Sequence, residues 1–223
     1  MPWSAAIIAG GPASRLGGRN KSSLPVGGRS ILDRQIAALR PLTDRIAIVA
    51  NTPARFRASG LPVVRDVLPG AAALGGIYTA LTRATTDYVL VIACDMPFLT
   101  ARFLEHLAGC AEGADLAIPR PPDGYQPMCA CYARTCREPI RKRIALGTLR
   151  IQDLVADVRT REIGPDELAA FDPDGLLFFN VNTPADYERA QQLAERYDVR
   201  PDAPDDRITQ RGRPAATKPG APR

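Results

Sequence analysis

The sequence predicts an α/β protein with a three-layer, Rossmann-like architecture, in which a doubly wound, mostly parallel sheet carries helices on both faces. Short apolar runs of strand length alternate with segments of helical periodicity over the first two-thirds of the chain. This β-α-β rhythm is typical of parallel sheets covered by helices. Glycines and polar residues follow several of these runs directly. They therefore fall at the carboxyl ends of the expected strands, where such sheets bind ligands.

Strand-length apolar runs and helical spacing give the order of the elements. We expect strands over residues 5–9, 45–51, 61–66, 87–95, 114–119 and 124–133. We expect helices over residues 30–40, 74–84, 100–110, 137–146 and 149–158. Residues 175–197 are expected to close the fold with a strand that leads into a helix. That last helix has a well-formed start, because Thr183 is followed by Pro184 at the first helical position and by Asp186 three residues on.

The positive charge of the chain is concentrated at its end. The 223 residues carry a formal net charge of +5, and residues 200–223 hold six Arg or Lys against three Asp. That segment supplies +3 of the +5, which leaves too little charge elsewhere for a nucleic-acid partner. It is also rich in proline and poor in apolar residues. We therefore predict a single domain over residues 1–198 and a disordered, basic, Pro-rich tail over residues 199–223.

Leader, membrane and cysteine patterns give further expectations. The first residues resemble no secretory leader, and no apolar run is long enough to span a bilayer, so we expect a cytoplasmic protein with no membrane partner.

The five cysteines fit neither a disulfide framework nor a zinc site of known spacing, and we expect reduced thiols. Cys129, Cys131 and Cys136 are the best candidates for a metal cluster, but the sole histidine, His106, is remote in sequence. We interpret His106 as an ordinary surface or packed residue.

A glycine-rich segment, GGPASRLGGRNK, follows the first predicted strand. It is not a Walker A loop, because Asn20 rather than glycine precedes Lys21, and it lacks the G-x-G-x-x-G of a dinucleotide site. Glycines that turn backbone N–H groups inward form a nest for anions, and Arg15 and Lys21 supply two cations beside it. The segment is thus either a polyphosphate site or a glycine-rich surface turn. Its position at a strand end favours the first.

Polar side chains also end two later strands. Asp95 closes the apolar run YVLVIACD and is a candidate ligand for Mg²⁺ on phosphate oxygens. The alternative is that Asp95 only caps the turn before the next helix. Asp66 allows the same two interpretations. Asn180 and Asn182 fall on one face if a strand continues that far, and otherwise they belong to the turn before Thr183.

These segments, taken in order, resemble the nucleoside triphosphate transferase family, and within it the MobA-type branch of molybdenum cofactor guanylyltransferases. The matching segments are IIAGGPASRLGGRNK at 7–21, VAN at 49–51, VVRD at 63–66, ALGGIYTAL at 73–81, CDMPFL at 94–99 and NVNTPADY at 180–187. The resemblance implies a fold like that of the nucleotide-diphospho-sugar transferases. It also implies transfer of GMP from GTP to the terminal phosphate of molybdopterin, with release of pyrophosphate and with Mg²⁺ as cofactor.

The resemblance also implies a role for each matching residue. The backbone of Ile8, Ala9, Gly10 and Gly11 would contact the nucleotide, and Arg15 and Lys21 would neutralise its phosphates. Asn51 and Asp66 would lie at the nucleoside, Asp95 would hold Mg²⁺, and Asn180 and Asn182 would face the pterin. Molybdenum-insertion proteins and recipient molybdoenzymes are possible partners.

Two departures from the family pattern leave the nucleotide base open. Asn20 stands where the family has Asp, and Ala-Leu-Gly-Gly replaces its Gly-Pro segment. The alternatives are a CTP-dependent molybdopterin cytidylyltransferase, a sugar-phosphate or polyol-phosphate nucleotidyltransferase of the same fold, and a non-catalytic cofactor carrier.

Overall fold

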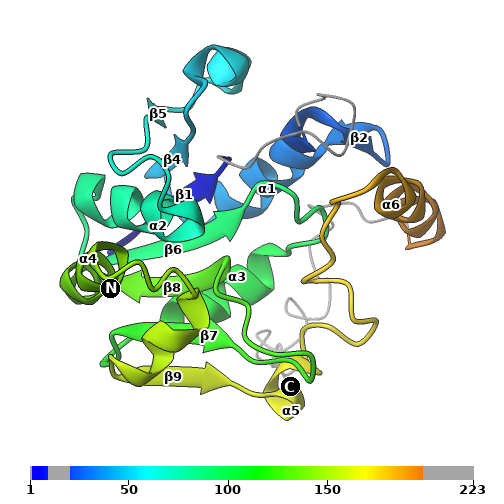
Figure 1. Cartoon of the computed structure of the whole chain (residues 1–223). Helices are drawn as coiled ribbons and strands as arrows, with labels where there is room; N and C mark the ends of the chain where they lie inside the picture. Colours follow the sequence, from blue (N-terminus) through cyan, green and yellow to red (C-terminus); the bar gives the residue numbers. More distant parts are fainter. Residues whose placement is uncertain (1, 10–20, 198–223) are drawn as a thin grey trace, which may run out of the picture.

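The computed structural model describes residues 2–9 and 21–197, which build a central sheet of seven strands in the order β5-β4-β1-β6-β8-β7-β9 (Figure 1). The strands are β1 (Trp3–Ile8), β4 (Ile46–Val49), β5 (Val63–Val64), β6 (Tyr88–Ala93), β7 (Leu116–Pro119), β8 (Cys129–Ala133) and β9 (Thr160–Ile163). Strands β5, β4, β1 and β6 run parallel to one another, whereas β8 is antiparallel to both β6 and β7, and β9 is parallel to β7. The predicted mostly parallel α/β sheet is thereby confirmed.

Helices cover both faces of this sheet, as predicted (Figure 1). They are α1 (Ile31–Leu39), α2 (Ala72–Arg83), α3 (Ala101–Gly109), α4 (Arg137–Ala145), α5 (Pro165–Leu168) and α6 (Pro184–Tyr197). Alternate residues of β1 serve the two faces: Ile7 is buried with α1 and α3, and Ile8 is buried with α2 and α4. Both faces of the sheet are therefore buried, which explains why the sequences of its strands are continuous apolar runs.

A two-stranded hairpin lies beside the sheet and was not predicted. It consists of β2 (Pro25–Val26) and β3 (Arg29–Ser30), joined by Gly27 and Gly28 with φ of 56° and 79°. Two successive positive φ angles are typical of the tight turn that matches strand twist, and glycine adopts them without strain. The hairpin packs with α6 around a separate small core that includes Val26, Phe98 and Val181.

The predicted strand before the last helix is wrong. Residues 175–182 contain no strand: a bend at Gly175 and a turn at Leu177 and Phe178 are followed by irregular backbone. The Asp172 carboxylate accepts the N–H groups of Leu176 and Leu177 at 2.6 and 3.1 Å. Asn180 and Asn182 therefore do not share a face by strand alternation. The helix that follows begins as predicted, since Thr183 and Asp186 cap each other's backbone N–H groups at 3.1 and 2.8 Å.

Smaller differences lie in the second half of the chain. The helix expected over 149–158 is a 3-10 helix over Ile151–Ala156, strand β9 and the short helix α5 were not predicted, and the strand expected from residue 124 begins only at Cys129. Other short 3-10 helices cover Lys21–Ser23, Pro53–Ser59 and Arg134–Cys136. No helix within residues 2–9 and 21–197 is both long and apolar enough to cross a bilayer. The predicted tail lies outside the described residues.

Candidate active site

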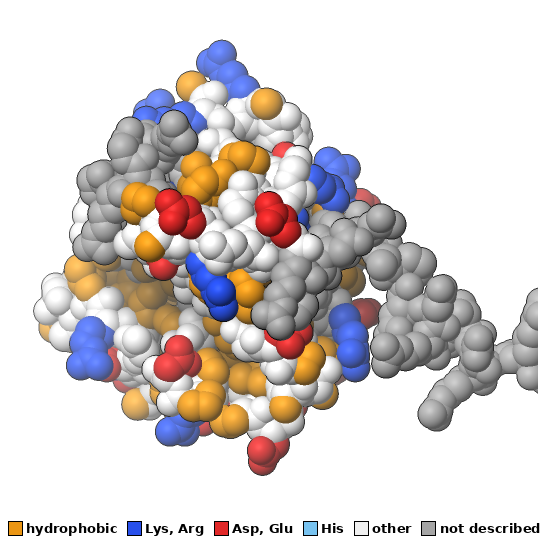
Figure 2. Space-filling model, turned by 90° about the vertical axis from the view of Figure 1, so that its right-hand side faces the viewer, with side chains coloured by type: hydrophobic (Ala, Val, Ile, Leu, Met, Phe, Trp, Pro, Cys, Tyr) orange, Lys and Arg blue, Asp and Glu red, His pale blue; other side chains and the backbone are white. Residues whose placement is uncertain are grey.

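A cleft of about 1010 Å³ opens at the carboxyl ends of the parallel strands. Figure 2 shows this side of the molecule, where acidic and basic side chains gather around a hollow with apolar walls. The predicted site residues that line the cleft are Ile8, Ala9, Lys21, Asn51, Asp66, Asp95, Asn180 and Asn182. Gly10, Gly11 and Arg15 lie outside the described residues. The structure thus brings every described candidate from the sequence to one cavity.

Lys21 lies between two polar side chains of the cleft. Its ammonium group donates to the Asn182 amide oxygen at 2.5 Å and to Asp95 Oδ2 at 3.4 Å. The three residues come from segments that are remote in sequence, and both Lys21 and Asp95 keep only about a fifth of their side chains exposed, 21% and 17%. This cluster places a positive charge and a carboxylate side by side in a partly dry cavity.

Only one of the two Asp95 carboxylate oxygens has a hydrogen-bond partner among the described residues. Burial raises the pKa of Asp95, and the nearby Lys21 ammonium opposes that rise. Its second oxygen, Oδ1, is buried and accepts no hydrogen bond from any described residue. A buried carboxylate oxygen without a donor is costly unless a cation binds it. The donor set therefore fits a divalent cation, which prefers carboxylate oxygens and phosphate oxygens together.

Two neighbouring segments hold the turn that carries Asp95. The amide of Gln35, a buried residue of α1, donates to the carbonyl of Ala93 at 2.6 Å and to that of Met96 at 3.1 Å. On the other side, the N–H of Val181 donates to the Asp95 carbonyl at 2.9 Å. The turn is thus bracketed by α1 and by the segment that precedes α6. Sequence analysis did not assign Gln35 to the site, although its amide contacts this turn.

The segment before α6 is fixed by its helix cap. The Asp186 carboxylate accepts the N–H groups of Asn182 and Thr183 at 2.9 and 2.8 Å. Burial works against the charged form, but these hydrogen bonds outweigh it and lower the pKa of Asp186. The cap orients Asn182 toward Lys21. Asn180 also lines the cleft, and its amide donates to the carbonyl of Phe178 at 2.9 Å.

Asp66 has a structural role as well as a place in the cleft. Its Oδ1 accepts the Thr79 hydroxyl at 2.8 Å and the N–H of Leu68 at 3.0 Å, which joins the end of β5 to α2. Gly75 of α2 permits this approach, because a Cβ there would lie 2.9 Å from Asp66 Oδ2. Both sequence interpretations of Asp66, turn residue and ligand residue, remain compatible with this geometry.

The glycine pair of ALGGIYTAL is required by packing. A Cβ on Gly76 would lie 2.8 Å from Cγ2 of Ile8, at the end of β1, and one on Gly75 would lie 2.7 Å from the carbonyl of Leu68. The first turns of α2 can therefore approach the strand ends only without side chains. This explains why the segment keeps two glycines although it departs from the family pattern.

One wall of the cleft comes from a segment that sequence analysis did not assign to the site. Tyr125, Gln126 and Met128 line it, and all three precede β8. Because β8 runs antiparallel to β6, its amino end lies beside the carboxyl end of β6. Strand direction is set by tertiary topology, so no local signal in the sequence would have placed these residues there.

Cys94, the cysteine beside Asp95, is not suited to act as a covalent nucleophile. Burial raises the pKa of Cys94 to about 12, so its thiol stays protonated. Cys129, Cys131 and Cys136 are buried free thiols, as expected for reduced cysteines.

The fold and the cleft define an α/β protein of the nucleotide-transferring class, and the comparisons with known proteins agree. The structure is similar to that of molybdopterin-guanine dinucleotide biosynthesis protein A from Archaeoglobus fulgidus, with a TM-score of 0.76 and 26% identity, over 86% of this chain and 99% of that one. The sequence is 33% identical over 186 residues to the molybdenum cofactor guanylyltransferase of Desulfosudis oleivorans, across 83% of this chain and 92% of the relative. Residues 5–161 match the MobA-like NTP transferase domain. The chain belongs to this family, and the resemblance seen in the sequence is confirmed.

Manganese occurs in a solved structure of the same fold. Rv0371c from Mycobacterium tuberculosis was determined as a complex with manganese, and it matches this chain with a TM-score of 0.62 and 18% identity, over 86% of this chain and 99% of that one. At that identity the likeness shows the fold alone.

Proposed function

We propose that the protein is a molybdenum cofactor guanylyltransferase, which transfers GMP from GTP to the terminal phosphate of molybdopterin. A phosphate oxygen of molybdopterin forms the new bond to the α-phosphorus of GTP. The bond from that phosphorus to the bridging oxygen of the β-phosphate breaks, and its electron pair leaves with pyrophosphate. Family membership supports the proposal. The observation that carries it is the cluster of Lys21, Asp95 and Asn182 in the cleft.

The triphosphate would bind where the glycine-rich segment meets the cleft. Ala9 and Lys21, the described residues that flank the glycine-rich segment in the sequence, both line the cleft. Backbone N–H groups and cations at that position would neutralise the triphosphate and the departing pyrophosphate. The residues assigned to this role are Ile8, Ala9, Gly10, Gly11, Arg15 and Lys21.

Asp95 is the residue that would hold Mg²⁺, through the buried oxygen that has no donor among the described residues. When bound there, Mg²⁺ would neutralise charge that develops on the phosphate oxygens. Lys21 would then keep its contact with Asn182 and direct its charge toward the phosphates. Because nucleotidyl transfer needs positioning and charge more than covalent help, these residues suffice without a nucleophilic side chain.

The nucleoside and the pterin would occupy opposite ends of the cleft. Asn51 follows β4 and Asp66 follows β5, so we assign both to the nucleoside. Asn180 and Asn182 precede α6, Asn182 contacts Lys21, and we assign both asparagines to the pterin. We also propose the cytoplasm as the compartment of the reaction, because all five cysteines are free thiols.

The experiment combines the purified chain with molybdopterin, Mg²⁺ and one of GTP, CTP, ATP or UTP, and measures pyrophosphate release and the mass of the product. We expect release with GTP and a guanine dinucleotide product. Release with CTP alone would show the cytidylyltransferase alternative, and nucleotide binding without exchange of pyrophosphate into GTP would show a carrier. The Glu112→Gln variant, which changes an exposed carboxylate outside the cleft, serves as the matched control for Asp95→Asn.

A further inference from the structure

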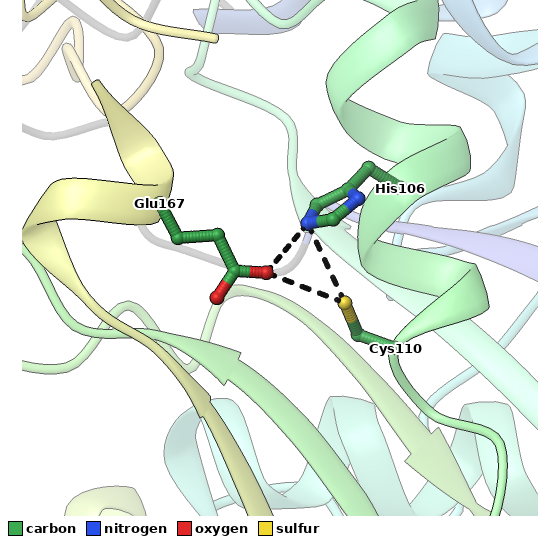
Figure 3. A group of neighbouring side chains, drawn as sticks. All are labelled: His106, Cys110 and Glu167. Atoms are coloured by element: carbon green, nitrogen blue, oxygen red, sulfur yellow. Dashed lines mark hydrogen bonds and ion pairs between the residues drawn. The ribbon is translucent and has the colours of Figure 1, made fainter. Parts of the chain in front are cut away.

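Three side chains with metal-binding atoms meet at a second place in the fold. His106 and Cys110 lie one helical turn apart, in α3 and at its carboxyl-terminal cap, and Glu167 approaches them from α5 (Figure 3). His106 Nε2 lies 2.8 Å from Glu167 Oε1 and 3.5 Å from Cys110 Sγ, and Sγ lies 3.8 Å from the same carboxylate oxygen. None of the three residues lines the cleft. The trio is therefore separate from the candidate active site.

The donor set is that of a thiophilic divalent cation. It offers one imidazole nitrogen, one thiol sulfur and one carboxylate oxygen, the three ligand types that Zn²⁺ takes in proteins. Zinc–ligand bonds of about 2.0–2.3 Å in a tetrahedron separate the donor atoms by roughly 3.3–3.6 Å. The two distances to sulfur already lie near this range, and the nitrogen–oxygen distance must widen by about 0.5 Å when coordination replaces the hydrogen bond. The trio needs only a small side-chain shift to surround a metal ion.

Neighbouring residues hold two of the three donors in place. One guanidinium nitrogen of Arg161 donates to both oxygens of Glu167, at 2.9 and 2.8 Å. The ring of Phe171 stacks on His106 with centroids 4.5 Å apart. Metal-binding carboxylates and imidazoles in proteins are commonly oriented by such outer contacts. A carboxylate accepts several hydrogen bonds, so Glu167 can keep Arg161 and still bind a metal through one oxygen.

We propose that His106, Cys110 and Glu167 form a binding site for Zn²⁺. All three residues are half-buried, so water can reach the trio and supply the fourth ligand. On binding, the S–H bond of Cys110 breaks, its proton goes to solvent, and the sulfur bonds to the metal. The ion joins α3 to α5 and adds a cross-link between segments that are 57 residues apart in sequence, from Cys110 to Glu167.

The test uses Co²⁺ as a spectroscopic substitute for Zn²⁺, on the full chain without an affinity tag and with Mg²⁺ in excess. Cobalt bound to a thiolate has an intense charge-transfer absorption that carboxylate sites lack. We expect one equivalent of Co²⁺ to produce this absorption and Zn²⁺ to abolish it by displacement. We expect Cys110→Ser and His106→Ala to remove it, and Glu167→Gln to weaken the affinity tenfold or more.

Two cysteine variants serve as matched controls. Cys136→Ser changes a buried thiol elsewhere, and Cys94→Ser changes the thiol beside Asp95. Both should keep the absorption. The proposal is overturned if wild-type protein gives no thiolate absorption, or if Cys94→Ser removes it while Cys110→Ser does not. Far-ultraviolet circular dichroism of each metal-free variant shows whether a loss of binding is a loss of fold. Glu167→Gln keeps the size of this half-buried side chain and so provides a ligand variant with less risk to folding.

Discussion

Gln35 offers a direct test of how the turn that carries Asp95 is held. Its side chain is buried, with 1% of the residue exposed, and it donates two hydrogen bonds, to the carbonyls of Ala93 and Met96. The Gln35→Met substitution keeps the length and removes both donors. Each lost hydrogen bond costs about 1 kcal/mol. The Gln35 amide oxygen is itself buried with no donor among the described residues, which is unfavourable. Removing this oxygen therefore offsets part of the stability lost with the two hydrogen bonds.

The expected net loss of stability is therefore small, on the order of 1 kcal/mol. The expected loss of turnover is larger, because a reacting group displaced by about 1 Å can lose 100-fold in rate. We expect Gln35→Met to lower kcat tenfold or more, to change KM for GTP little, and to raise the Mg²⁺ concentration needed for half-maximal activity. Pyrophosphate release measured against GTP and Mg²⁺ gives all three quantities.

The matched control is Ile163→Val in β9, a buried position away from the cleft with an expected cost of about 0.5–1.5 kcal/mol. Chemical unfolding of both variants places them on one stability scale. If Gln35→Met loses stability as Ile163→Val does but keeps wild-type kcat and Mg²⁺ dependence, Gln35 packs α1 against the sheet without positioning Asp95.

Three further predictions concern catalysis, packing and pH. Asp95→Asn should lower pyrophosphate release 100-fold or more and weaken GTP binding, followed by calorimetry, much less; equal losses in both would contradict a role at the metal. Gly76→Ala places a methyl group against Ile8 and should destabilise the protein by about 1–3 kcal/mol, whereas an unchanged Tm would show that α2 moves freely. Hydrogen bonds from Arg159 and Thr135 lower the pKa of Asp115 to about 2, so its contribution is present above the unfolded-state pKa and is lost as pH falls toward 2. Asp115→Asn should accordingly destabilise the protein at pH 7 and much less at pH 2, by thermal unfolding; an equal loss at both would refute the linkage.

The site residues that could be predicted are polar side chains that come directly after an apolar run of strand length. Asp66 and Asp95 stand where two runs stop, and parallel strands bring such ends to one edge of the sheet. The helix cap at Thr183 and Asp186 was predictable for a similar reason, because its hydrogen bonds are local. Local signals and one topological rule therefore predicted the carboxylates of the cleft and the helix cap beside it.

Residues 175–182 show where a local signal fails. The apolar run GLLFFNV is long enough for a strand, but its side chains divide between two cores: Leu177 and Phe178 pack with α3, and Leu176, Phe179 and Val181 pack with α6. A strand would present alternate residues to two faces of one sheet, whereas this segment connects two separate clusters. The Asp172 side chain also takes the backbone N–H groups that a strand would use. Which core a side chain enters is decided by tertiary packing.

The same reasoning explains why Gln35 was missed although a signal for it existed. A lone uncharged polar residue lies beside Ile36 and Leu39 on the buried side of α1. Burying an amide is unfavourable unless it finds partners, and helix backbone groups are already paired, so a buried glutamine must bond to another segment. The carbonyls at the end of a strand and in the turn after it lie outside regular pairing and are the natural acceptors. A glutamine on the apolar face of a helix between two strands therefore indicates a strand end that is held in place, and here that strand end carries the carboxylate assigned to the metal.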